Sequence, residues 1–329
     1  MDLGWSFSFS LDGSGPPAAA APAPLSAPAP SVSPPLHLHW LAPPAALLHP
    51  GFDAASWCGA PLLPVQAGLV RVVVADADDV AGASLDVVPG RYEGGAKVWE
   101  CTRDALRHIG GQAGAGSRVA AVLAAGGAVV ADVGCGAGLL GVAALAAGAA
   151  HCAFLDLNAE VLRRVTMPNV AANVGAAGLR RSSFLAGPWS AIAEAAAASG
   201  DAGGVEGGES AGAGEAEAVG ERGRPSLRSL LGRVDLVLAS ETLYAPSSYS
   251  AFLDVLEALL TPGTGVALIA TKRMYYGVGG GTEAFLRVVA LRPGVTASRL
   301  EALQDGASIV RDVLLLERAG GVCRASAGT

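Results

Sequence analysis

The chain has 329 residues, a formal net charge of −7, 45 glycines and only 5% aromatic residues. Most of the negative charge lies between Glu194 and Arg222, where seven acidic residues accompany one basic residue. The rest is close to neutral and has no basic cluster, so we expect no direct nucleic-acid binding. The five cysteines form no C-x-x-C pair and the five histidines complete no zinc pattern, so we expect no metal site.

The start of the chain constrains its location. It reads MDLGWSFSFSLDG, and the first basic residue is Arg71. This pattern differs from a secretory signal and from an Arg-rich transit peptide. The longest apolar run, around residues 119–131, is too short to span a bilayer. We therefore expect a protein of the cytoplasm, the nucleus or both, with no membrane association. We also expect a monomer, because the sequence has no sustained coiled-coil heptads.

Composition divides the chain into two parts. Residues 1–64 form a low-complexity segment, rich in proline, alanine and serine from residue 13 to about 50. This segment lacks bulky apolar residues, so we expect it to be largely disordered. Phe7 and Phe9 just before it are compatible with a short strand, a docking segment or a frayed terminus. Residues 65–329 are expected to form one domain, with a disordered Gly/Ala/Glu insert at about 195–226.

The predicted elements of this domain alternate between strand and helix. A β-branched strand is expected within 68–80, and a helix within 99–109. Further helices are expected at 139–148, at 157–177 with a break near Pro168, at 249–261 and at 281–290. Seven more strands are expected at 128–133, 151–156, 182–187, 234–240, 265–271, 295–303 and 309–317. The alternation predicts an α/β fold with a doubly wound, mostly parallel seven-stranded sheet, and the last two strands form an antiparallel hairpin.

A glycine loop follows the strand predicted at 128–133. Gly134, Gly136 and Gly138 give a G-x-G-x-G spacing before the next helix. A dinucleotide fingerprint needs its third glycine at position 139, where this chain has Leu139, so a nicotinamide cofactor is disfavoured. Taken alone, the loop is also compatible with a simple tight turn between a strand and a helix.

Two carboxylates beside this loop indicate its ligand. Asp132 ends one predicted strand, where it is placed to bind a ligand amine, and Asp156 ends the next, where ribose hydroxyls are bound in such folds. A nucleoside that also carries an amino acid has both groups, so the pair predicts S-adenosylmethionine as the cofactor. For Asp156, helix N-capping is the alternative interpretation.

These motifs resemble a known family. The order of the glycine loop, the acidic strand end, ASET at 239–242 and the terminal hairpin is similar to that of seven-strand, Rossmann-like class I methyltransferases. The match is closer to the histidine protein methyltransferase 1 family, and it covers most of residues 85–290. The Pro/Ala segment and the acidic insert do not match. The residues that carry the resemblance are VPGRYEGGAKVWECTRDAL, DVGCGAGLLGVAAL, FLDLNAEVLRRVTMPNVAAN, GPWS, LVLASETLYAPSSYSAF and YYGVGGGTEAF.

The resemblance implies a domain at 65–329 that transfers a methyl group from S-adenosylmethionine to a histidine imidazole nitrogen. It implies a protein substrate, a large-subunit ribosomal protein. The implied and inferred cofactor contacts are Trp99, Glu100, Cys101, Asp132, Gly134, Gly136, Gly138, Asp156, Leu157, Asn158, Gly187, Trp189 and Ser240. Trp99 and Glu100, in the stretch KVWECT, are interpreted as a segment that closes over the glycine loop. A core position is the alternative for Trp99.

The acceptor side is predicted from two stretches that follow the fourth and fifth strands. In SETLY, Glu241 is expected to orient the acceptor ring and Tyr244 to wall its pocket. The alternatives are a glutamate that caps the following helix and a tyrosine that packs on it. In the stretch KRMYYGVGGGTE, glycines after tyrosines indicate substrate contact, with a flexible hinge as the alternative. The expected substrate-binding residues there are Lys272, Tyr275, Tyr276 and Gly279.

Two other functions fit the same motifs. A glutamate followed three residues later by a tyrosine is also similar to the E-x-x-Y signature of protein-lysine methyltransferases. A methyltransferase-like fold that serves as a binding or chaperone module for a ribosomal protein is the alternative outside enzymology. The sequence leaves both open.

Overall fold

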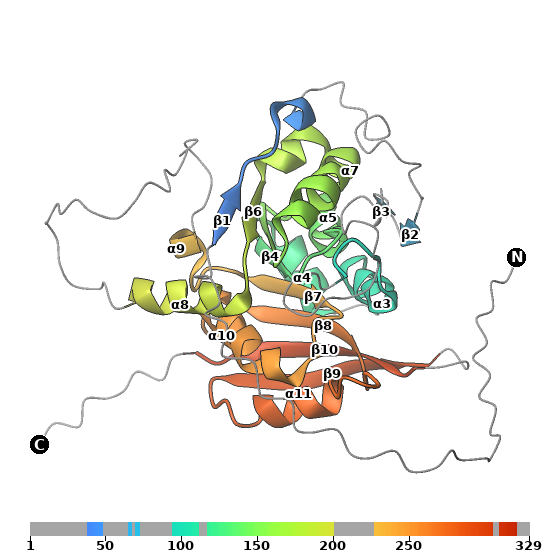
Figure 1. Ribbon diagram of the computed structural model, residues 1–329, viewed down its shortest axis with the longest axis vertical. Helices are drawn as coiled ribbons and strands as arrows, with labels where there is room; N and C mark the ends of the chain where they lie inside the picture. The colour runs from blue at the N-terminus through green and yellow to red at the C-terminus, as the bar shows by residue number, and fades with distance from the viewer. Residues whose placement is uncertain are drawn as a thin grey trace, which may run out of the picture. The chain divides into compact units, whose positions relative to one another are not determined.

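The computed structural model describes residues 38–48, 65–67, 70–72, 94–111, 117–200, 227–304 and 309–320, all within one unit of residues 36–329. An eight-stranded sheet with the order β1-β6-β5-β4-β7-β8-β10-β9 runs through this unit (Figure 1). Its strands are β1 (His39–Leu41), β4 (Val129–Val133), β5 (His151–Asp156), β6 (Ser182–Ala186), β7 (Leu236–Ser240), β8 (Val266–Lys272), β9 (Val295–Leu303) and β10 (Arg311–Arg318).

The sheet has the doubly wound topology expected from the sequence. Strands β6, β5, β4, β7 and β8 pair in parallel, while β10 pairs antiparallel with both β8 and β9. The last strand is thus inserted between β8 and β9, which confirms the expected C-terminal hairpin. Strand order runs outward in opposite directions from the neighbours β4 and β7. In such sheets, ligands bind outside the carboxyl ends of the strands at this reversal.

An eighth strand comes from a segment that was expected to be largely disordered. β1 pairs antiparallel with β6, with His39 opposite Ala186 and Leu41 opposite Phe184. Leu41 and Leu47, which belongs to the 3₁₀ helix η1 (Ala45–Leu48), are buried in the core. The sequence interpretation weighed the Pro/Ala content and missed these two apolar anchors. The Pro/Ala run at 13–37 and the Phe7/Phe9 stretch lie outside the described residues.

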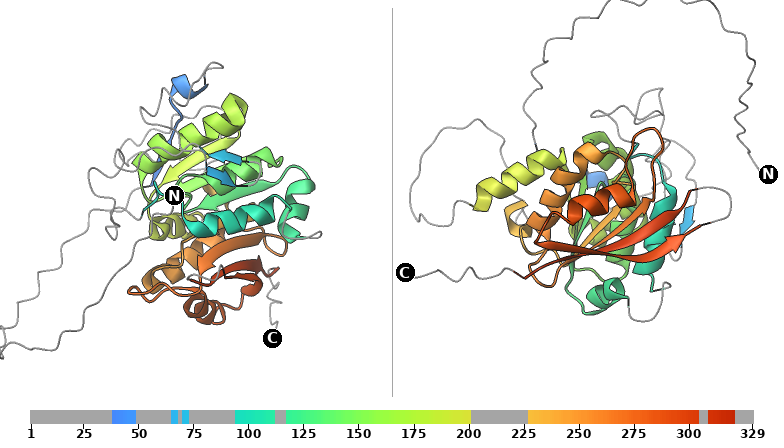
Figure 2. Two further views of the ribbon diagram at one scale, coloured as in Figure 1. Left: turned by 90° about the vertical axis from the view of Figure 1, so that its right-hand side faces the viewer. Right: turned by 90° about the horizontal axis from the view of Figure 1, so that it is seen from below.

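Helices cover both faces of the sheet because side chains of each strand alternate between the faces (Figures 1 and 2). Val130 of β4 packs in the cluster with α3, α4, α5 and α7, while its neighbour Ala131 packs in the cluster with α8, α9, α10 and α11. The helices are α3 (Glu100–Ile109), α4 (Arg118–Ala124), α5 (Leu139–Ala146), α7 (Met167–Arg180), α8 (Trp189–Gly200), α9 (Leu227–Leu230), α10 (Tyr249–Leu259) and α11 (Thr282–Val289). No helix within the described ranges is both long and apolar enough to cross a membrane.

The helical stretch after β5 departs from a regular helix before the proline rather than at it. α6 (Ala159–Val161) continues through the π-helical turn η2 (Leu162–Thr166) into α7. Pro168 lies in the first turn of α7, directly after the π-helical turn. A proline has no N–H for the helical hydrogen bond and its ring crowds the preceding turn, so a local departure from α-helical geometry just before it is expected. A second irregularity occurs inside α7 at Gly175, whose φ is 62°.

One sequence expectation about boundaries needs correction. The insert placed at about 195–226 begins later, because residues 195–200 complete helix α8. Its remainder, 201–226, lies outside the described residues. The strand expected within 68–80 is present as β3 (Val70–Val72), which pairs with β2 (Val65–Ala67) in a separate two-stranded sheet, and residues 73–80 lie outside the described residues.

Candidate active site at the carboxyl edge of the sheet

A cavity of about 670 Å³ lies where the parallel strands end. Each of the five parallel strands contributes wall residues at or just after its carboxyl end, which places the cavity at the β4/β7 reversal. Thirteen of the residues predicted from the sequence lie on its wall: Trp99, Asp132, Gly134, Gly136, Asp156, Leu157, Gly187, Trp189, Ser240, Glu241, Tyr244, Lys272 and Tyr275.

Six other predicted residues do not reach the wall: Glu100, Cys101, Gly138, Asn158, Tyr276 and Gly279. Cys101 is fully buried in the core, whereas the Glu100 side chain is 65% exposed. Tyr276 is 78% exposed. Gly138 packs against Thr166 and Phe154 behind the loop. The sequence therefore identified the segments that line the cavity, but within these segments only some of the predicted residues face it.

The glycine loop meets the KVWECT segment through backbone contact. Gly136 has a φ of +50°, and a Cβ there would lie 2.7 Å from the Gly95 carbonyl oxygen. Only glycine therefore fits at this contact. Gly134 also has a positive φ, of +67°, and a Cβ on it would lie 2.9 Å from Thr242 Cγ2. The loop is a tight turn, as the alternative interpretation held, and it also forms part of the cavity wall.

Asp132 is buried at the floor of the cavity. Its Oδ2 accepts a hydrogen bond from the Gly141 N–H at 2.9 Å, in the first turn of α5. Burial raises the pKa of Asp132 to about 8, and the nearby Asp156 charge adds to this effect while the Gly141 bond opposes it. An amine cation placed beside this carboxylate would stabilise its ionised form.

Asp156 joins the end of β5 to the glycine loop. Oδ2 accepts the Gly136 N–H at 2.9 Å, and Oδ1 accepts the Asn158 N–H at 2.9 Å. Burial raises the pKa of Asp156, and these backbone hydrogen bonds oppose the rise. Helix capping alone does not describe Asp156, because one of its two carboxylate oxygens accepts a hydrogen bond from the glycine loop. The carboxylate also lines the cavity.

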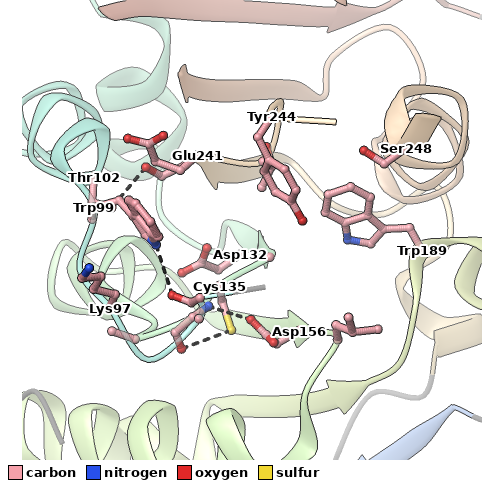
Figure 3. Close-up of a pocket in the computed structure, with 18 of the residues that line it drawn as sticks. Lys97, Trp99, Thr102, Asp132, Cys135, Asp156, Trp189, Glu241, Tyr244 and Ser248 are labelled. Carbon is pink, nitrogen blue, oxygen red and sulfur yellow. Dashed lines mark hydrogen bonds between the residues drawn. The ribbon is translucent and has the colours of Figure 1, made fainter. Parts of the chain in front are cut away.

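Trp99 lies on the cavity wall and is only half-buried, so it is not a core residue. Its Nε1 donates to the Gly94 carbonyl oxygen at 3.1 Å. The ammonium groups of Lys97 and Lys272 each lie 5.5 Å from the centre of its ring. Figure 3 shows Trp99 and Lys97 on the side of the cavity opposite Tyr244 and Trp189.

Glu241 has the most unusual backbone of the site. It is the one non-glycine residue with a positive φ, of 57°, in the part of the chain that the structure describes. Its buried carboxylate accepts the Cys101 N–H at 3.3 Å through Oε1 and the Tyr275 hydroxyl at 2.5 Å through Oε2. Strained, over-determined residues of this kind cluster at functional sites. Glu241 does bond a helix N-terminus, but of α3 rather than of the helix that follows it.

Tyr275 and Tyr244 continue the wall from Glu241. Their rings meet edge to face with centres 6.4 Å apart. Burial raises the pKa of Tyr275 well above its usual range, and the Glu241 charge adds to the rise, so its hydroxyl stays protonated. The hydroxyl end of Tyr244 points into the cavity (Figure 3).

The triple glycine after Tyr276 has a role inside the chain. A Cβ on Gly280 would lie 2.1 Å from the Tyr244 carbonyl oxygen, so the loop packs directly on that backbone. Around Gly279, by contrast, the space is open. The close backbone approach found here is to Tyr244 of the chain itself, and the substrate contact expected from these glycines stays a prediction.

Several wall residues were missed by the sequence interpretation. Thr102 hydrogen-bonds Ser240 through their hydroxyls at 3.1 Å. Thr242 is buried, and its hydroxyl has no hydrogen-bond partner among the described residues. Its position directly after Glu241 was a signal that could have identified it. The other missed residues are Gly94, Gly95, Lys97, Val98, Cys135, Ala137, Leu139, Leu140, Pro188, Ser190, Ser247, Ser248, Ala251 and Val278.

Within the described ranges, no three His, Cys, Asp or Glu side chains gather as a metal site would require.

Comparison with solved structures finds distant similarities to methyltransferases. An O-methyltransferase family protein from Burkholderia thailandensis matches with a TM-score of 0.42 and 16% identity, over 67% of this chain and 58% of that one. Magnesium protoporphyrin IX methyltransferase from Synechocystis, solved with bound SAM, matches with a TM-score of 0.40 and 13% identity, over 67% and 85%. Both scores are below 0.5, so the fold is assigned from the strand order of this chain itself.

No family model matches the chain. Several curated proteins are similar to the chain in sequence. Histidine protein methyltransferase 1 homolog of Bos taurus is 32% identical over 242 residues, which cover 67% of this chain and 55% of the relative. The protein of that name from Dictyostelium discoideum is 27% identical over 229 residues, covering 70% and 59%. The chain thus spans little more than half the length of these relatives. The resemblance expected from the sequence is confirmed: over about two thirds of its length, the chain is a sequence relative of the histidine protein methyltransferase 1 homologs.

Proposed function

We propose that the chain is an S-adenosylmethionine-dependent protein-histidine N-methyltransferase. One observation carries the proposal: a single cavity joins the glycine loop and two buried carboxylates to a second wall made by Glu241, Tyr244 and Tyr275. The wall formed by the glycine loop and the two carboxylates suits a nucleoside cofactor. The wall formed by Glu241, Tyr244 and Tyr275 suits a flat polar acceptor. The name of the curated relatives supports the reaction type.

The residues present fit the cofactor. The volume of about 670 Å³ is within the range of small-molecule sites. The buried hydroxyl of Thr242, a residue of the cavity wall, has no hydrogen-bond partner among the described residues, as expected of a group that bonds a ligand. Asp132 would face the ligand amine and Asp156 the ribose hydroxyls, while Gly134 and Gly136 let the backbone come close. The cofactor supplies a methyl group activated by a sulfonium.

The chain's own contribution is to hold the acceptor nitrogen in line with that methyl group. Positioning of this kind supplies roughly 7–11 kcal/mol of the barrier reduction. A histidine has an ordinary pKa of about 6.5 and keeps one free lone pair when neutral, so no strong base is needed. As the lone pair forms the N–C bond, the bond between the methyl carbon and sulfur would break, its electron pair staying on the departing thioether. The proton on the other ring nitrogen then passes to solvent.

Glu241 is proposed to select the acceptor tautomer. Each carboxylate oxygen has two lone pairs, and the Cys101 N–H and the Tyr275 hydroxyl occupy one on each. The remaining lone pairs can accept the ring N–H of the substrate histidine, which leaves its other nitrogen free to react. Tyr244 would form the side wall of this acceptor position.

The substrate is proposed to be a large-subunit ribosomal protein, and the family resemblance supports this. A protein partner also agrees with the exposed apolar side chains of Met274, Tyr276 and Val278, which follow β8 beside the cavity. Such exposed groups are typical of interaction sites. Action in the cytoplasm or nucleus follows from the same substrate.

Transfer of radiolabelled methyl groups from S-adenosylmethionine to ribosomal proteins tests the proposal. Mass spectrometry of the product should locate the label on histidine. Label on lysine would favour the E-x-x-Y alternative, and binding without transfer would favour the binding or chaperone module. Thermal stabilisation by S-adenosylmethionine and not by NAD is the expected cofactor result. Stabilisation by NAD alone would contradict it.

A further inference from the structure

Lys272, the last residue of β8, occupies a small cage at the acceptor wall. Its ammonium nitrogen lies 5.5 Å from the ring centre of Trp99 and 5.8 Å from that of Tyr275. It is 3.3 Å from Glu100 Oε2 and 3.9 Å from Glu241 Oε1. We call these four residues the cation cage. The Lys272 side chain is only 13% exposed and lines the cavity.

Aromatic faces combined with carboxylates form the arrangement that binds ammonium ligands. Left empty, this cage would attract a lysine side chain or a protonated imidazole presented by a substrate. In this chain its own lysine fills it. A second cation at the acceptor wall would meet the Lys272 charge at short range in a partly desolvated site, where like charges repel strongly.

We propose that Lys272 is a specificity-determining residue that fills the cation cage, so that the site admits an uncharged acceptor nitrogen and rejects a protonated amine. The selectivity part rests on the proposed function. The acceptor class that results is a neutral heteroaromatic nitrogen such as imidazole. Occupation of the cage by Lys272 can be tested separately from acceptor selectivity, because binding of a ligand to the cage requires no methyl transfer.

The substitution Lys272→Met removes the charge and keeps much of the apolar stem. Glu241 retains the Cys101 N–H and the Tyr275 hydroxyl as partners, so we expect the variant to fold. Lys272→Arg keeps the charge in the cage. Lys97→Met is a matched control, since the Lys97 ammonium also lies 5.5 Å from the Trp99 ring centre but the residue is exposed and, among the described residues, forms no ion pair with Glu100 or Glu241.

The first experiment titrates each full-length protein with choline and with its uncharged isostere 3,3-dimethylbutanol, using calorimetry. Lys272→Met should bind choline at least roughly ten-fold more tightly than the wild type does, with no matching gain for the alcohol. Lys97→Met and Lys272→Arg should behave like the wild type. Equal choline binding by the wild type and Lys272→Met would overturn the proposal. If Lys272→Met has a lower melting temperature, Lys272→Gln takes its place.

The second experiment compares methyl transfer to two peptides that differ only in a histidine or a lysine at the acceptor position. The ratio of lysine to histidine methylation should rise about ten-fold or more in Lys272→Met and stay unchanged in Lys97→Met. An unchanged ratio in Lys272→Met would overturn the selectivity. If the wild type methylates no histidine in peptide or ribosomal protein, the proposed function fails, and the choline titration still decides whether Lys272 fills the cage.

Discussion

The Glu241 carboxylate accepts a hydrogen bond from the backbone N–H of Cys101, a residue 140 positions away in the sequence, at 3.3 Å. Cys101 is the second residue of α3, so its N–H is one of the unpaired donors at a helix start. The partial positive charge of that helix end favours the carboxylate. The contact fixes the KVWECT segment to the end of β7, and both segments line the cavity through Trp99 and Glu241.

Replacing Glu241 should separate acceptor orientation from cofactor binding. Glu241→Gln keeps an oxygen for the Cys101 N–H but loses the charge that holds the acceptor ring, so we expect kcat/KM for methyl transfer to fall by about 10²-fold through lost positioning. The Kd of S-adenosylmethionine should change by less than about three-fold, because the cofactor wall is intact. Steady-state kinetics and calorimetry provide the two readouts. A large loss of cofactor affinity with unchanged kcat would contradict the assigned role.

Asp132 should make folding stability depend on pH. Its folded pKa of about 8 exceeds the ordinary pKa of 3.8 for an aspartate, so between these values only the unfolded chain releases this proton. Its contribution to stability is therefore fully present below about pH 4 and is lost as pH rises towards 8, with a slope of up to about 1.4 kcal/mol per pH unit. In chemical denaturation from pH 5 to 8, Asp132→Asn should flatten the decline. Parallel curves for the two proteins would refute this.

The contact between Gly136 and Gly95 should tolerate no side chain. Gly136→Ala adds a Cβ at 2.7 Å from a carbonyl oxygen, in addition to the strain of a φ of +50°. Gly126→Ala is a matched control, since Gly126 has a φ of +74° but no atom within 4 Å of the added Cβ. The control should lose about 1–2 kcal/mol of unfolding free energy from strain alone, and Gly136→Ala should lose clearly more. Equal losses of unfolding free energy in the two variants would contradict the prediction, because they would show that the backbone near Gly95 moves to accept the added Cβ at little energetic cost.

The two residues at the centre of KVWECT should differ in their effect on the cofactor. The ring of Trp99 lines the cavity, whereas Glu100 lies off the wall and pairs with Lys272. We expect Trp99→Ala to weaken S-adenosylmethionine binding about ten-fold and Glu100→Ala to change it by about two-fold or less. Calorimetry on both variants checks this. A greater loss in Glu100→Ala would restore the direct contact predicted from the sequence.

The sequence predicted the parts of the site that short motifs encode. Asp132 and Asp156 lie at the carboxyl ends of strands with clear apolar character, and the glycine spacing follows the first of them, so their meeting at one sheet edge follows from parallel topology. The bond from Cys101 to Glu241 could not be predicted, because it joins distant segments and depends on a backbone φ of 57°. The cation cage was missed for a similar reason, since its members come from the start of α3 and the turns after β7 and β8, while its occupant Lys272 ends β8.

The short strand β1 has a consequence for how this chain can be handled. Its three residues cover the outer side of β6, a fully buried strand whose unpaired backbone groups would otherwise form an open edge. Open apolar edges recruit strands from other molecules. A protein trimmed to 65–329, the domain boundary suggested by composition, would lose this cover. It should self-associate more readily than one that retains residues 36–48, although it keeps all of the residues that line the cavity.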